Sequence, residues 1–448
     1  MPTPSARPSG IPDRVNVLLL GTGGREHALA WKMKASPRLG ELWVEAGANA
    51  GLAALGTTCP EAIDVRQMFR LTRWCERENI GLVVIGPEAP LAQDFATLLA
   101  APNRPVFGPS RDGARLEWDK AYAKQLMRSV SIPTAEGRIF DNHEAAARYL
   151  ESRESDVVIK ASGLASGKGV VVCTSRAEAM AAIDRIMLKK EFGEAGNQIV
   201  IEERLRGQEV SVLALVDGRT ISVLDPCQDH KQVGEGDVGA NTGGMGAYCP
   251  TPVLDDAQLA QIERQVLVPA IDGLRREGVT FRGVLYAGLM LTPAGPKVLE
   301  FNTRFGDPET QPLMVRLKSD LVELLYATAT GQLDAVDYAF DPRTAVTVVV
   351  CAEGYPGSIV KGKPITGLDE AKEVEGVTIF HAGTGRNAKG ELVTTGGRVF
   401  GVTALGADLA EAQARANEAA SRIVFQGAFF RRDIGHRVLK RRADQPVS

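Results

Sequence analysis

The segment DVVIKASGLASGKGVVVC, residues 156–173, limits the possible fold more than any other stretch of the chain. An apolar run leads into a glycine-rich turn, and the β-branched residues at 170–172 then favour a second strand. A P-loop would continue into a helix instead. The segment therefore predicts a β-hairpin that covers a nucleotide like a flap, with Lys160 reaching its phosphates. A hairpin with only a structural role is the alternative, although Lys160 and Lys168 would gain little from packing there.

The segment KVLEFNTRFGDPETQ, residues 297–311, carries the candidate metal site. Glu300 and Asn302 stand two apart, so in a strand both side chains leave the same face. Their oxygen ligands suit Mg²⁺, whereas Zn²⁺ would require His or Cys. Arg304 adds a cation that can neutralise charge developing on a transferred phosphoryl group. An exposed strand end with solvated charges is the alternative.

The stretch VNVLLLGTGGREHALAWKM, residues 15–33, predicts a strand, a tight turn and a helix that begins at about His27. Gly23 and Gly24 let backbone amides approach an anion, and Arg25 adds a fixed charge. The third glycine of the dinucleotide fingerprint is absent. A redox dinucleotide site and a purely structural turn both remain open.

Further strands at residues 42–46, 82–85 and 106–107 alternate with helices near 66–79 and 91–100. This alternation predicts a doubly wound parallel sheet in the N-terminal part of the chain. The turns GANAG (47–51) and GPEAPL (86–91) follow strands, so they are expected at the carboxyl edge, where such sheets bind ligands. Ordinary Gly/Pro turns are the alternative interpretation.

The segments on either side of the flap suit a nucleotide site. A helix at about 110–130 carries Lys120 and Lys124, and residues 198–218 predict a strand pair. The link at residues 202–205 can present backbone groups to an adenine edge, with Glu209 available to ribose hydroxyls. An acidic strand end is the alternative.

Residues 225–250 are predicted to form one long loop, and loops of this length are usually functional. Several of its residues suit a small polar substrate: Asp229, His230, Lys231, Asn241, Gly243 and Gly244. His230 is either a general base or only an orienting hydrogen-bonding group. A helix at about 255–277 and a hairpin that turns at residues 292–295 lead back to Glu300.

The last part of the chain predicts a smaller α+β domain, with a strand at residues 344–351 and a helix at about 408–424. No catalytic cluster is expected there. The turns GTGR (383–386) and TTGGRV (394–399) are expected to be structural, with a contribution to the site as the alternative. The KRR run at residues 440–442 is expected to lie in a solvated tail.

Length and charge narrow the class of protein. A chain of 448 residues should hold three or four domains, and its net charge of −3 gives no reason to expect bulk binding to nucleic acid or an anionic membrane. Six cysteines without a CxxC pair indicate reduced thiols and a cytoplasmic location. Residues 1–14 have the composition of a disordered extension, and no apolar run is long enough for a signal peptide or a membrane helix.

The glycine-rich flap, the acidic link and the strand with metal ligands resemble the ATP-grasp superfamily. More narrowly, six motifs in order between about residues 16 and 435 resemble the glycinamide ribonucleotide synthetase (phosphoribosylamine–glycine ligase) family: GGREHALAW, GPEAPL, GLASGKGVV, QDHKQVGEGDVGANTGGMGAY, LYAGLM and EFNTRFGDPETQP. The resemblance implies that ATP phosphorylates glycine and that 5-phosphoribosylamine attacks the glycyl phosphate. The products would be glycinamide ribonucleotide, ADP and phosphate, in de novo purine biosynthesis.

The resemblance also implies roles for individual residues. Glu300 and Asn302 would bind Mg²⁺ or Mn²⁺, and Arg304 and Asp307 would lie near the reacting carboxylate. ATP would be held by the two lysines, the flap turn and the link: Lys120, Lys160, Gly163, Gly167, Lys168, Gly169, Glu202, Glu203, Leu205 and Glu209. The other substrates would be held by residues from the N-terminal turns and the long loop: Gly23, Gly24, Arg25, Asn49, Gly86, Pro87, Glu88, Asp229, Asn241, Gly243 and Gly244.

The expected architecture is a multidomain α/β and α+β protein. An extension at 1–14 precedes a doubly wound domain at 15–119, an ATP-grasp domain at 120–330 with a flap subdomain at about 137–207, a C-terminal α+β domain at 340–437 and a tail at 438–448. The resemblance implies a monofunctional, monomeric enzyme that contacts neighbouring purine-pathway enzymes at most transiently.

Two positions depart from the family pattern. Ser162 stands where the family usually has Asp, which puts in doubt a charged role for that position. Residues 286–290 also lack the carboxylate that other superfamily members carry on the penultimate strand. The rival interpretations are another carboxylating or ligating ATP-grasp enzyme, a nucleotide-binding regulatory module without turnover, and a dinucleotide-dependent redox protein.

Overall fold

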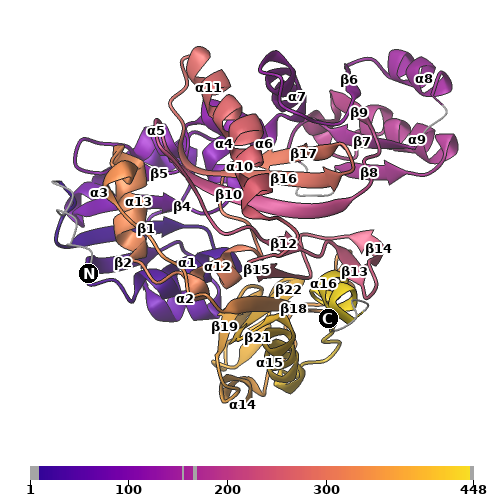
Figure 1. Cartoon of the computed structure of the whole chain (residues 1–448). Coiled ribbons are helices and arrows are strands. Elements are labelled where there is room, and N and C mark those ends of the chain that lie inside the picture. Colours follow the sequence, from indigo (N-terminus) through magenta and orange to yellow (C-terminus); the bar gives the residue numbers. More distant parts are fainter. Residues whose placement is uncertain (1–9, 154–155, 165–168, 444–448) are drawn as a thin grey trace.

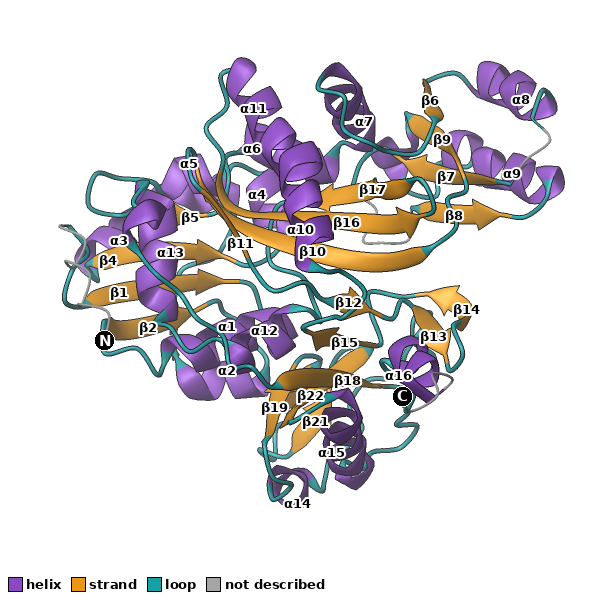
Figure 2. Ribbon diagram, in the orientation of Figure 1, coloured by secondary structure: helices purple, strands orange, loops and turns teal. Residues whose placement is uncertain are grey.

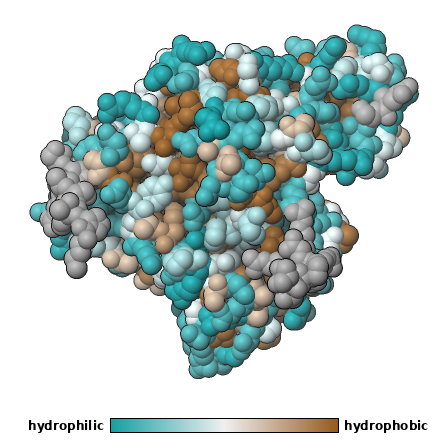
Figure 3. Space-filling model, viewed as in Figure 1, coloured by the Kyte–Doolittle hydropathy of each residue, from teal (hydrophilic) through white to brown (hydrophobic). Residues whose placement is uncertain are grey.

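The computed structural model describes residues 10–153, 156–164 and 169–443, and it is built around three sheets and a flap (Figure 1). Figure 2 shows the N-terminal sheet at one side, the long central sheet above it and the C-terminal sheet below. Hydrophilic residues cover most of the face in Figure 3, and hydrophobic residues gather towards its middle. Among the described residues, no helix is both long and apolar enough to cross a membrane.

The N-terminal sheet is parallel, with strand order β3-β2-β1-β4-β5, as predicted for a doubly wound domain. Val17 and Leu19 of β1 pack with α1 on one face, while Leu18 and Leu20 pack with Trp74 of α3 on the other. A strand buried on both faces explains the uninterrupted apolar run. The elements are β1 (Val15–Leu20), α1 (Gly24–Met33), β2 (Leu39–Val44), α2 (Ala50–Leu55), β3 (Thr57–Thr58), α3 (Met68–Arg77), β4 (Ile80–Ile85), α4 (Glu88–Ala92), α5 (Phe95–Leu99) and β5 (Val106–Phe107).

The central sheet is antiparallel, with strand order β11-β10-β16-β17. One face is covered by α7, α10 and α11, whose side chains share a core with Val212 and Ala287. The elements are α6 (Arg111–Trp118), α7 (Lys120–Ser129), β10 (Gln208–Asp217), β11 (Ile221–Val223), α10 (Asp256–Ile262), α11 (Val268–Arg276), β16 (Arg282–Thr292) and β17 (Gly295–Asn302), with a π-helical turn joining α10 to α11.

The flap is a four-stranded antiparallel sheet, with strand order β6-β9-β7-β8. β7 and β8 pair directly, from Val157 with Cys173 to Lys160 with Val170, which confirms the predicted hairpin. The central residues of its turn, 165–168, lie outside the described residues. The elements are β6 (Gly137–Phe140), α8 (His143–Glu151), β7 (Val157–Ala161), β8 (Val170–Cys173), α9 (Arg176–Ile183) and β9 (Ile199–Glu203).

The C-terminal sheet has strand order β12-β15-β18-β22-β19, so it takes two strands from the predicted long loop. Residues 225–250 are therefore not one loop: they form β12 (Gln228–Asp229), β13 (Gln232–Gly234), β14 (Val238–Asn241) and β15 (Gly246–Cys249). Strands of two to four residues containing glycine show little alternation, which is why the sequence did not reveal them. The remaining elements are β18 (Thr344–Cys351), α14 (Leu368–Lys372), β19 (Val377–His381), β20 (Thr384–Arg386), β21 (Leu392–Thr394), β22 (Arg398–Gly406), α15 (Leu409–Arg422) and α16 (His436–Ala443).

Two helix predictions need correction, as do the expected tail and the expected extension. The single helix expected at 110–130 breaks at Asp119, whose carboxylate caps α7 by accepting from Tyr122 N at 3.0 Å. The helix expected at 91–100 is α4 and α5, separated by Asp94 in a left-handed conformation. The expected tail begins inside α16, and residues 444–448 lie outside the described residues. The expected extension is also in contact with the domain at its end, where Arg14 donates to Leu39 O at 3.4 Å.

Two helices after β17 return to the N-terminal sheet. They are α12 (Thr310–Arg316) and α13 (Leu321–Thr330), and α13 lies across that sheet in Figure 1. Leu321, Val322 and Leu325 share a core with Phe107 of β5. This packing brings the segment after the metal-ligand strand against the N-terminal turns.

Candidate active site

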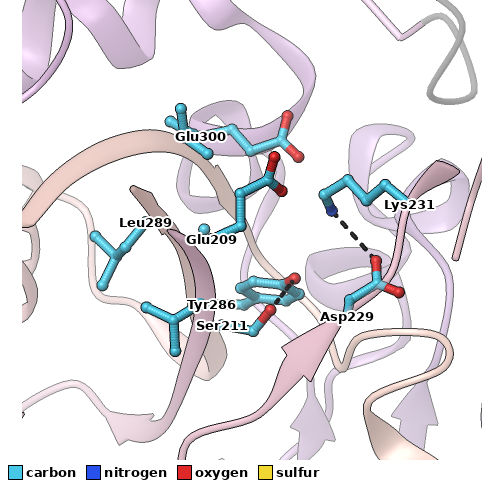
Figure 4. A pocket seen from close by; sticks show the side chains of 10 residues that line it. Glu209, Ser211, Asp229, Lys231, Tyr286, Leu289 and Glu300 are labelled. Atoms are coloured by element: carbon cyan, nitrogen blue, oxygen red, sulfur yellow. Dashed lines mark hydrogen bonds and ion pairs between the residues drawn. The ribbon is translucent and has the colours of Figure 1, made fainter. Parts of the chain in front are cut away.

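A polar pocket opens on the face of the central sheet that is turned away from α10 and α11 (Figure 4). Its floor is a row across three strands, formed by Ser211 on β10, Gly288 on β16 and Glu300 on β17. Gly288 has no side chain, so it leaves space above the row. Asp229 and Lys231 line the opposite wall. The pocket thus joins the central sheet to the segment that the sequence assigned to a polar substrate.

Glu300 and Asn302, the expected metal ligands, share one face of β17, because Phe301 between them packs into the core. Burial alone would raise the pKa of Glu300, but the positive charges of three lysines, Lys120 foremost, outweigh it and lower the pKa. The carboxylate is therefore ionised at neutral pH. A carboxylate and an amide oxygen fit Mg²⁺ that is shared with phosphates. No group of three His, Cys, Asp or Glu side chains suited to a metal occurs in the described part of the chain.

Two lysines neutralise Glu202 at the end of β9. Lys160 on β7 lies 2.7 Å from Glu202 Oε2 and donates to a carbonyl of β17 at 2.7 Å. Lys124, which is 1% exposed, lies 2.7 Å from Glu202 Oε1 and uses its other donors on Thr134 and Ala135. The side chain of Glu202 is thus occupied, and its backbone lies between the paired strands β6 and β7, so its contact with an adenine edge stays a prediction. Lys160 keeps one donor for a phosphate.

The rest of the link is braced against the central sheet. Glu203 Oε1 accepts from Glu136 N at 2.9 Å and lies 2.9 Å from Lys297 Nζ. Leu205 is half-buried, and Glu209 reaches the wall of the pocket. The link therefore has a fixed backbone beside the pocket, as a nucleotide site requires.

The flap turn is partly described. Ala161 N donates to Gly169 O at 2.8 Å, and Gly163 N donates to Ala195 O at 3.3 Å, so both ends of the turn are held. Gly167 and Lys168, which were also expected at the phosphates, lie outside the described residues.

Ser162 connects the flap turn to the start of α7. Its hydroxyl donates to Asp119 Oδ1 at 2.9 Å and accepts from Ala121 N at 3.0 Å, while its carbonyl accepts from Lys120 N at 2.9 Å. The carboxylate that the family pattern places at position 162 is therefore supplied in this chain from across the contact, by Asp119. This pairing also places Lys120 at the base of the flap.

Ser162→Asp is expected to destabilise the protein by about 1–3 kcal/mol, because it places a second buried carboxylate against Asp119. Asp119→Ser combined with Ser162→Asp restores one carboxylate and one hydroxyl, so the double variant should regain most of the lost stability. Urea denaturation of the three variants and the wild type measures this. If the loss of stability in the double variant equals the sum of the losses in the two single variants, the pairing of Ser162 with Asp119 is contradicted.

Asp229 and Lys231 form a pair on the wall of the pocket, with Lys231 Nζ 3.4 Å from Asp229 Oδ2. Burial raises the pKa of Asp229 to about 7, against the opposing charge of Lys231. Among the described residues, Asp229 Oδ1 is buried without a hydrogen-bond partner. The lining thus holds a carboxyl group that exchanges a proton near neutral pH.

Because the folded-state pKa of Asp229 lies above its ordinary value of 3.8, the folded protein favours the protonated form. Its contribution to the free energy of unfolding is lost as pH rises from about 4 to about 7 and is constant above that. Asp229→Asn should therefore increase stability at pH 8, by about 2–4 kcal/mol, and have little effect at pH 4. Urea denaturation at both pH values measures this, with exposed Asp112→Asn as the control; an equal effect at both pH values would contradict it.

His230 is not positioned as a catalytic base. It is 2% exposed, and its Nε2 accepts from Gly435 N at 3.0 Å, on the side away from the pocket. Burial and the charge of Arg431 lower its pKa to about 3, so it stays neutral. His230 is therefore a packing and hydrogen-bonding residue between β12 and the C-terminal segment.

The residues that follow the short hairpin, β13 and β14, approach the site at its base. Gly243 N donates to Tyr355 Oη at 3.0 Å, and its carbonyl accepts from Arg398 at 2.8 Å. Gly244 has φ +117°, and a Cβ there would collide with Pro308 and lie 2.8 Å from Asp229 Oδ1. Asn241 is exposed, and its side chain accepts from Gln232 at 3.3 Å. The glycine pair therefore allows close contact between this segment and the one that follows β17.

The N-terminal turn is arranged around the buried carboxylate of Glu26. Glu26 accepts from Gly23 N at 2.8 Å and pairs with Arg25 at 2.6 Å, and a Cβ at Gly86 would collide with it. Arg25 also donates to Phe305 O at 3.0 Å, just after β17. The N-terminal domain is thereby joined to the metal-ligand strand. Pro87 lies in the second predicted turn, whereas Gly24 is already the first residue of α1, so this helix begins earlier than the expected start at about His27.

Asn49 braces this turn and does not present a free amide. Its Oδ1 accepts from Leu52 N, while its Nδ2 donates to Thr22 O and Gly23 O, all at 2.9 Å. The side chain is 3% exposed. The side chain therefore supports the turn, and a contact of Asn49 with substrate stays a prediction.

Arg304 links the end of β17, which carries the candidate metal ligands, to two other segments. Its guanidinium lies 3.0 Å from Glu117 Oε1 and 3.7 Å from Glu88 Oε2, and it donates to Asn302 Oδ1 at 3.2 Å. Its Nε is buried and has no hydrogen-bond partner among the described residues. Glu117 was not singled out from the sequence. Arg304 thus holds a positive charge at the junction of the sheet, α6 and the GPE turn.

The C-terminal domain contributes Arg398, contrary to the expectation of structural turns. Arg398 lies 3.2 Å from Asp307 Oδ2 and donates to Asp307 O at 2.7 Å. Burial would raise the pKa of Asp307, but the charges of Arg398 and Arg25 lower it. Asp307 thus connects the C-terminal domain to the N-terminal turn.

Strand β16 has no carboxylate of its own at residues 286–290, but the side chain of Glu309 lies beside it. Glu309 Oε1 accepts from Tyr286 Oη at 2.6 Å, and Tyr286 Oη lies 2.7 Å from Ser211 Oγ. Tyr286 and Ser211 both line the pocket (Figure 4). Residues 286–290 therefore carry no acid themselves, but Tyr286 is joined to one from the next segment.

Known protein families match this chain in its N-terminal, central and C-terminal parts. Three family models match in order: the phosphoribosylglycinamide synthetase N domain at residues 15–117, its ATP-grasp (A) domain at 118–310 and its C domain at 345–437. The phosphoribosylamine–glycine ligase of Rhodopirellula baltica is 51% identical over 433 residues, which is 95% of this chain and 98% of that protein. The phosphoribosylamine–glycine ligase of Nostoc is 47% identical over 426 residues, which is 95% of this chain and 100% of that protein.

A solved structure shows the same fold. The phosphoribosylamine–glycine ligase of Thermotoga maritima superposes with a TM-score of 0.81 at 33% sequence identity, covering 94% of this chain and 100% of that one. The match extends over the N-terminal, ATP-grasp and C-terminal parts together.

Proposed function

The chain belongs to the phosphoribosylglycinamide synthetase family, and from that membership we propose how its residues perform the ligation of glycine to 5-phosphoribosylamine. It is an ATP-dependent carbon–nitrogen ligase of purine biosynthesis. The position of Arg304 supports the proposed roles of the residues most directly. Arg304 follows β17 and contacts Glu88 in the GPE turn and Glu117 on α6. Reactants bound on the two domains would therefore meet beside Arg304.

ATP binds between the flap and the central sheet. Lys120 and Lys160 contact its phosphates, the backbone of the link faces adenine, and Glu209 faces the ribose. The flap strands β7 and β8 cover the phosphates and help to exclude water. Glu300 and Asn302 hold Mg²⁺ or Mn²⁺, which supplies charge neutralisation on the phosphates.

The first step transfers the γ-phosphoryl group of ATP to a carboxylate oxygen of glycine. The bond from the bridging oxygen to the γ-phosphorus breaks, ADP leaves, and glycyl phosphate forms. Arg304 stabilises charge on the equatorial oxygens of the transferred group. Its unpartnered Nε is a donor ready for such an oxygen.

The second step forms the amide. The amine of 5-phosphoribosylamine, held at Gly23, Gly24, Arg25 and the GPE turn, attacks the acyl carbon, and phosphate leaves. The nitrogen must lose a proton, and Asp229 can accept it because its pKa is about 7. Asp307 and Arg398 close the site from the C-terminal side.

Isotope transfer tests the glycyl phosphate. With glycine labelled with ¹⁸O in its carboxylate, one labelled oxygen should appear in the released phosphate, because the carboxylate oxygen stays on phosphorus when the amide forms. Mass spectrometry of the phosphate measures this. Unlabelled phosphate would contradict the acyl phosphate while leaving the ligation itself intact.

We also infer the cellular location and the oligomeric state of the enzyme. All six cysteines are free thiols. Reduced thiols support a cytoplasmic location. The enzyme acts as a monomer on small molecules, with no nucleic-acid or membrane partner, and contacts neighbouring purine-pathway enzymes at most transiently.

A further inference from the structure

The hairpin formed by β13 and β14 has little packing of its own beyond Val233, which lies against the C-terminal core. We call residues 232–241 the substrate hairpin, because Asp229 and Lys231 precede it and Gly243 and Gly244 follow it. All four residues of β14 are exposed, and Val238 is 60% exposed. An isolated two-stranded hairpin is marginally stable in water, so its order must come from contacts outside it.

Those contacts come from residues 431–437, here called the C-terminal clamp. Arg437 lies 2.6 Å from Asp237 Oδ2 with one guanidinium nitrogen and donates to it with another at 2.8 Å. Asp433 accepts from Gly236 N at 2.8 Å, and Arg432 N donates to Glu235 at 3.0 Å. Each residue of the hairpin tip, 235–237, is therefore bonded to the clamp.

Arg431 is the buried centre of this contact. It is 1% exposed, lies 3.1 Å from Asp237 Oδ1 and pairs with Asp433 at 2.8 Å. It also donates to Gln232 O at 2.9 Å, so it reaches the first residue of the hairpin as well as its tip. Buried charges paired in this way hold a particular geometry, because breaking one pair leaves an uncompensated charge.

The clamp contacts His230, whose two chain neighbours line the pocket. His230 accepts from Gly435 N at 3.0 Å, and its neighbours Asp229 and Lys231 line the pocket. At the other strand, Thr242 N donates to Lys231 O at 2.8 Å and closes the base of the hairpin. A shift of the hairpin would therefore move the wall of the pocket.

We infer that the C-terminal clamp, acting through the substrate hairpin and His230, positions Asp229 and Lys231 as a wall of the pocket that keeps water from the acyl phosphate and holds the amine substrate. Arg431, Asp433 and Arg437, with Asp237, are positioning residues and touch no reactant themselves. This inference rests on the proposed function. Loosening the wall would admit water, which hydrolyses glycyl phosphate to glycine and phosphate, so ADP would form without ribonucleotide product.

Asp237→Asn and Arg437→Gln test the clamp with little change in shape. Asp237 has φ +60°, a conformation that Asn also tolerates. Hydrogen exchange of residues 232–241 should accelerate about tenfold or more in each variant. The KM for 5-phosphoribosylamine should rise about fivefold or more, and the ratio of ADP to ribonucleotide should exceed one, while kcat for ADP release stays within about threefold.

The double variant and a surface control complete the test. Asp237→Asn with Arg437→Gln should be no worse than Asp237→Asn alone, because that change already weakens the pair with Arg437 as well as the pair with Arg431. Arg422→Ala removes an exposed ion pair with Glu418 on α15 and should leave exchange, KM and the ratio unchanged. Faster exchange with an unaltered ratio and KM would overturn the inference, as would unaltered exchange. If the wild type forms no ribonucleotide, the proposed function fails, whereas the exchange result still reports on the clamp.

Discussion

Glu300→Gln is expected to lower the ligation rate at least about 10³-fold at saturating Mg²⁺, with the fold intact. Gln keeps the size of the side chain but removes the negative charge that faces Lys120, Lys160 and Lys231. A divalent metal bound at the proposed site would lose its only carboxylate on β17, and the triphosphate would lose the neutralisation on which phosphoryl transfer depends. Glu300→Ala should be at least as severe.

Steady-state kinetics, MgADP binding and the Tm measure the effect of Glu300→Gln together. MgADP should bind at least about tenfold more weakly, and the Tm should change by only a few degrees. Glu277→Gln, which alters a carboxylate bonded to Tyr122 away from the pocket, is the matched control and should retain activity. Wild-type turnover by Glu300→Gln would refute the assignment of Glu300.

Arg304→Lys is expected to lower kcat at least about 100-fold, although the positive charge is retained. The Arg304 guanidinium contacts Glu117, Glu88 and Asn302 at once. A lysine is a point charge that cannot keep these contacts and still offer a donor to the transferred phosphoryl group. Because the lost interaction belongs to the transition state, the KM for ATP should change much less than kcat.

Arg316→Lys is the control for Arg304→Lys. Arg316 is more buried than Arg304, with 3% of its side chain exposed against 18%, and it bonds Asp225 and backbone carbonyls outside the pocket. Its replacement should reduce stability without altering kcat. Equal loss of kcat in both variants would show that Arg304 acts only through the fold.

Local patterns in the sequence predicted the elements that carry the site. The strand at residues 15–20 and the hairpin around the flap were recognisable because their apolar runs and glycines are contiguous. The shared face of Glu300 and Asn302 followed from the period of a strand alone. The family resemblance then supplied the activity, which the family models and relatives confirm.

What the sequence missed depends on contacts between distant segments. Arg398 reaches Asp307 from 91 residues away, and Glu117 reaches Arg304 from α6. The carboxylate beside Tyr286 belongs to Glu309, and the one beside Ser162 belongs to Asp119. Such pairs leave no periodic signal, because each partner looks like an ordinary polar residue in its own segment.

The most direct test of the account is ADP release by the purified protein with MgATP and glycine, with and without 5-phosphoribosylamine generated in situ from ribose 5-phosphate and ammonia. Release is expected to require both glycine and 5-phosphoribosylamine, and ribonucleotide is expected to form in an amount equal to ADP. ADP release without them, a requirement for bicarbonate, or ATP binding without any release would contradict it.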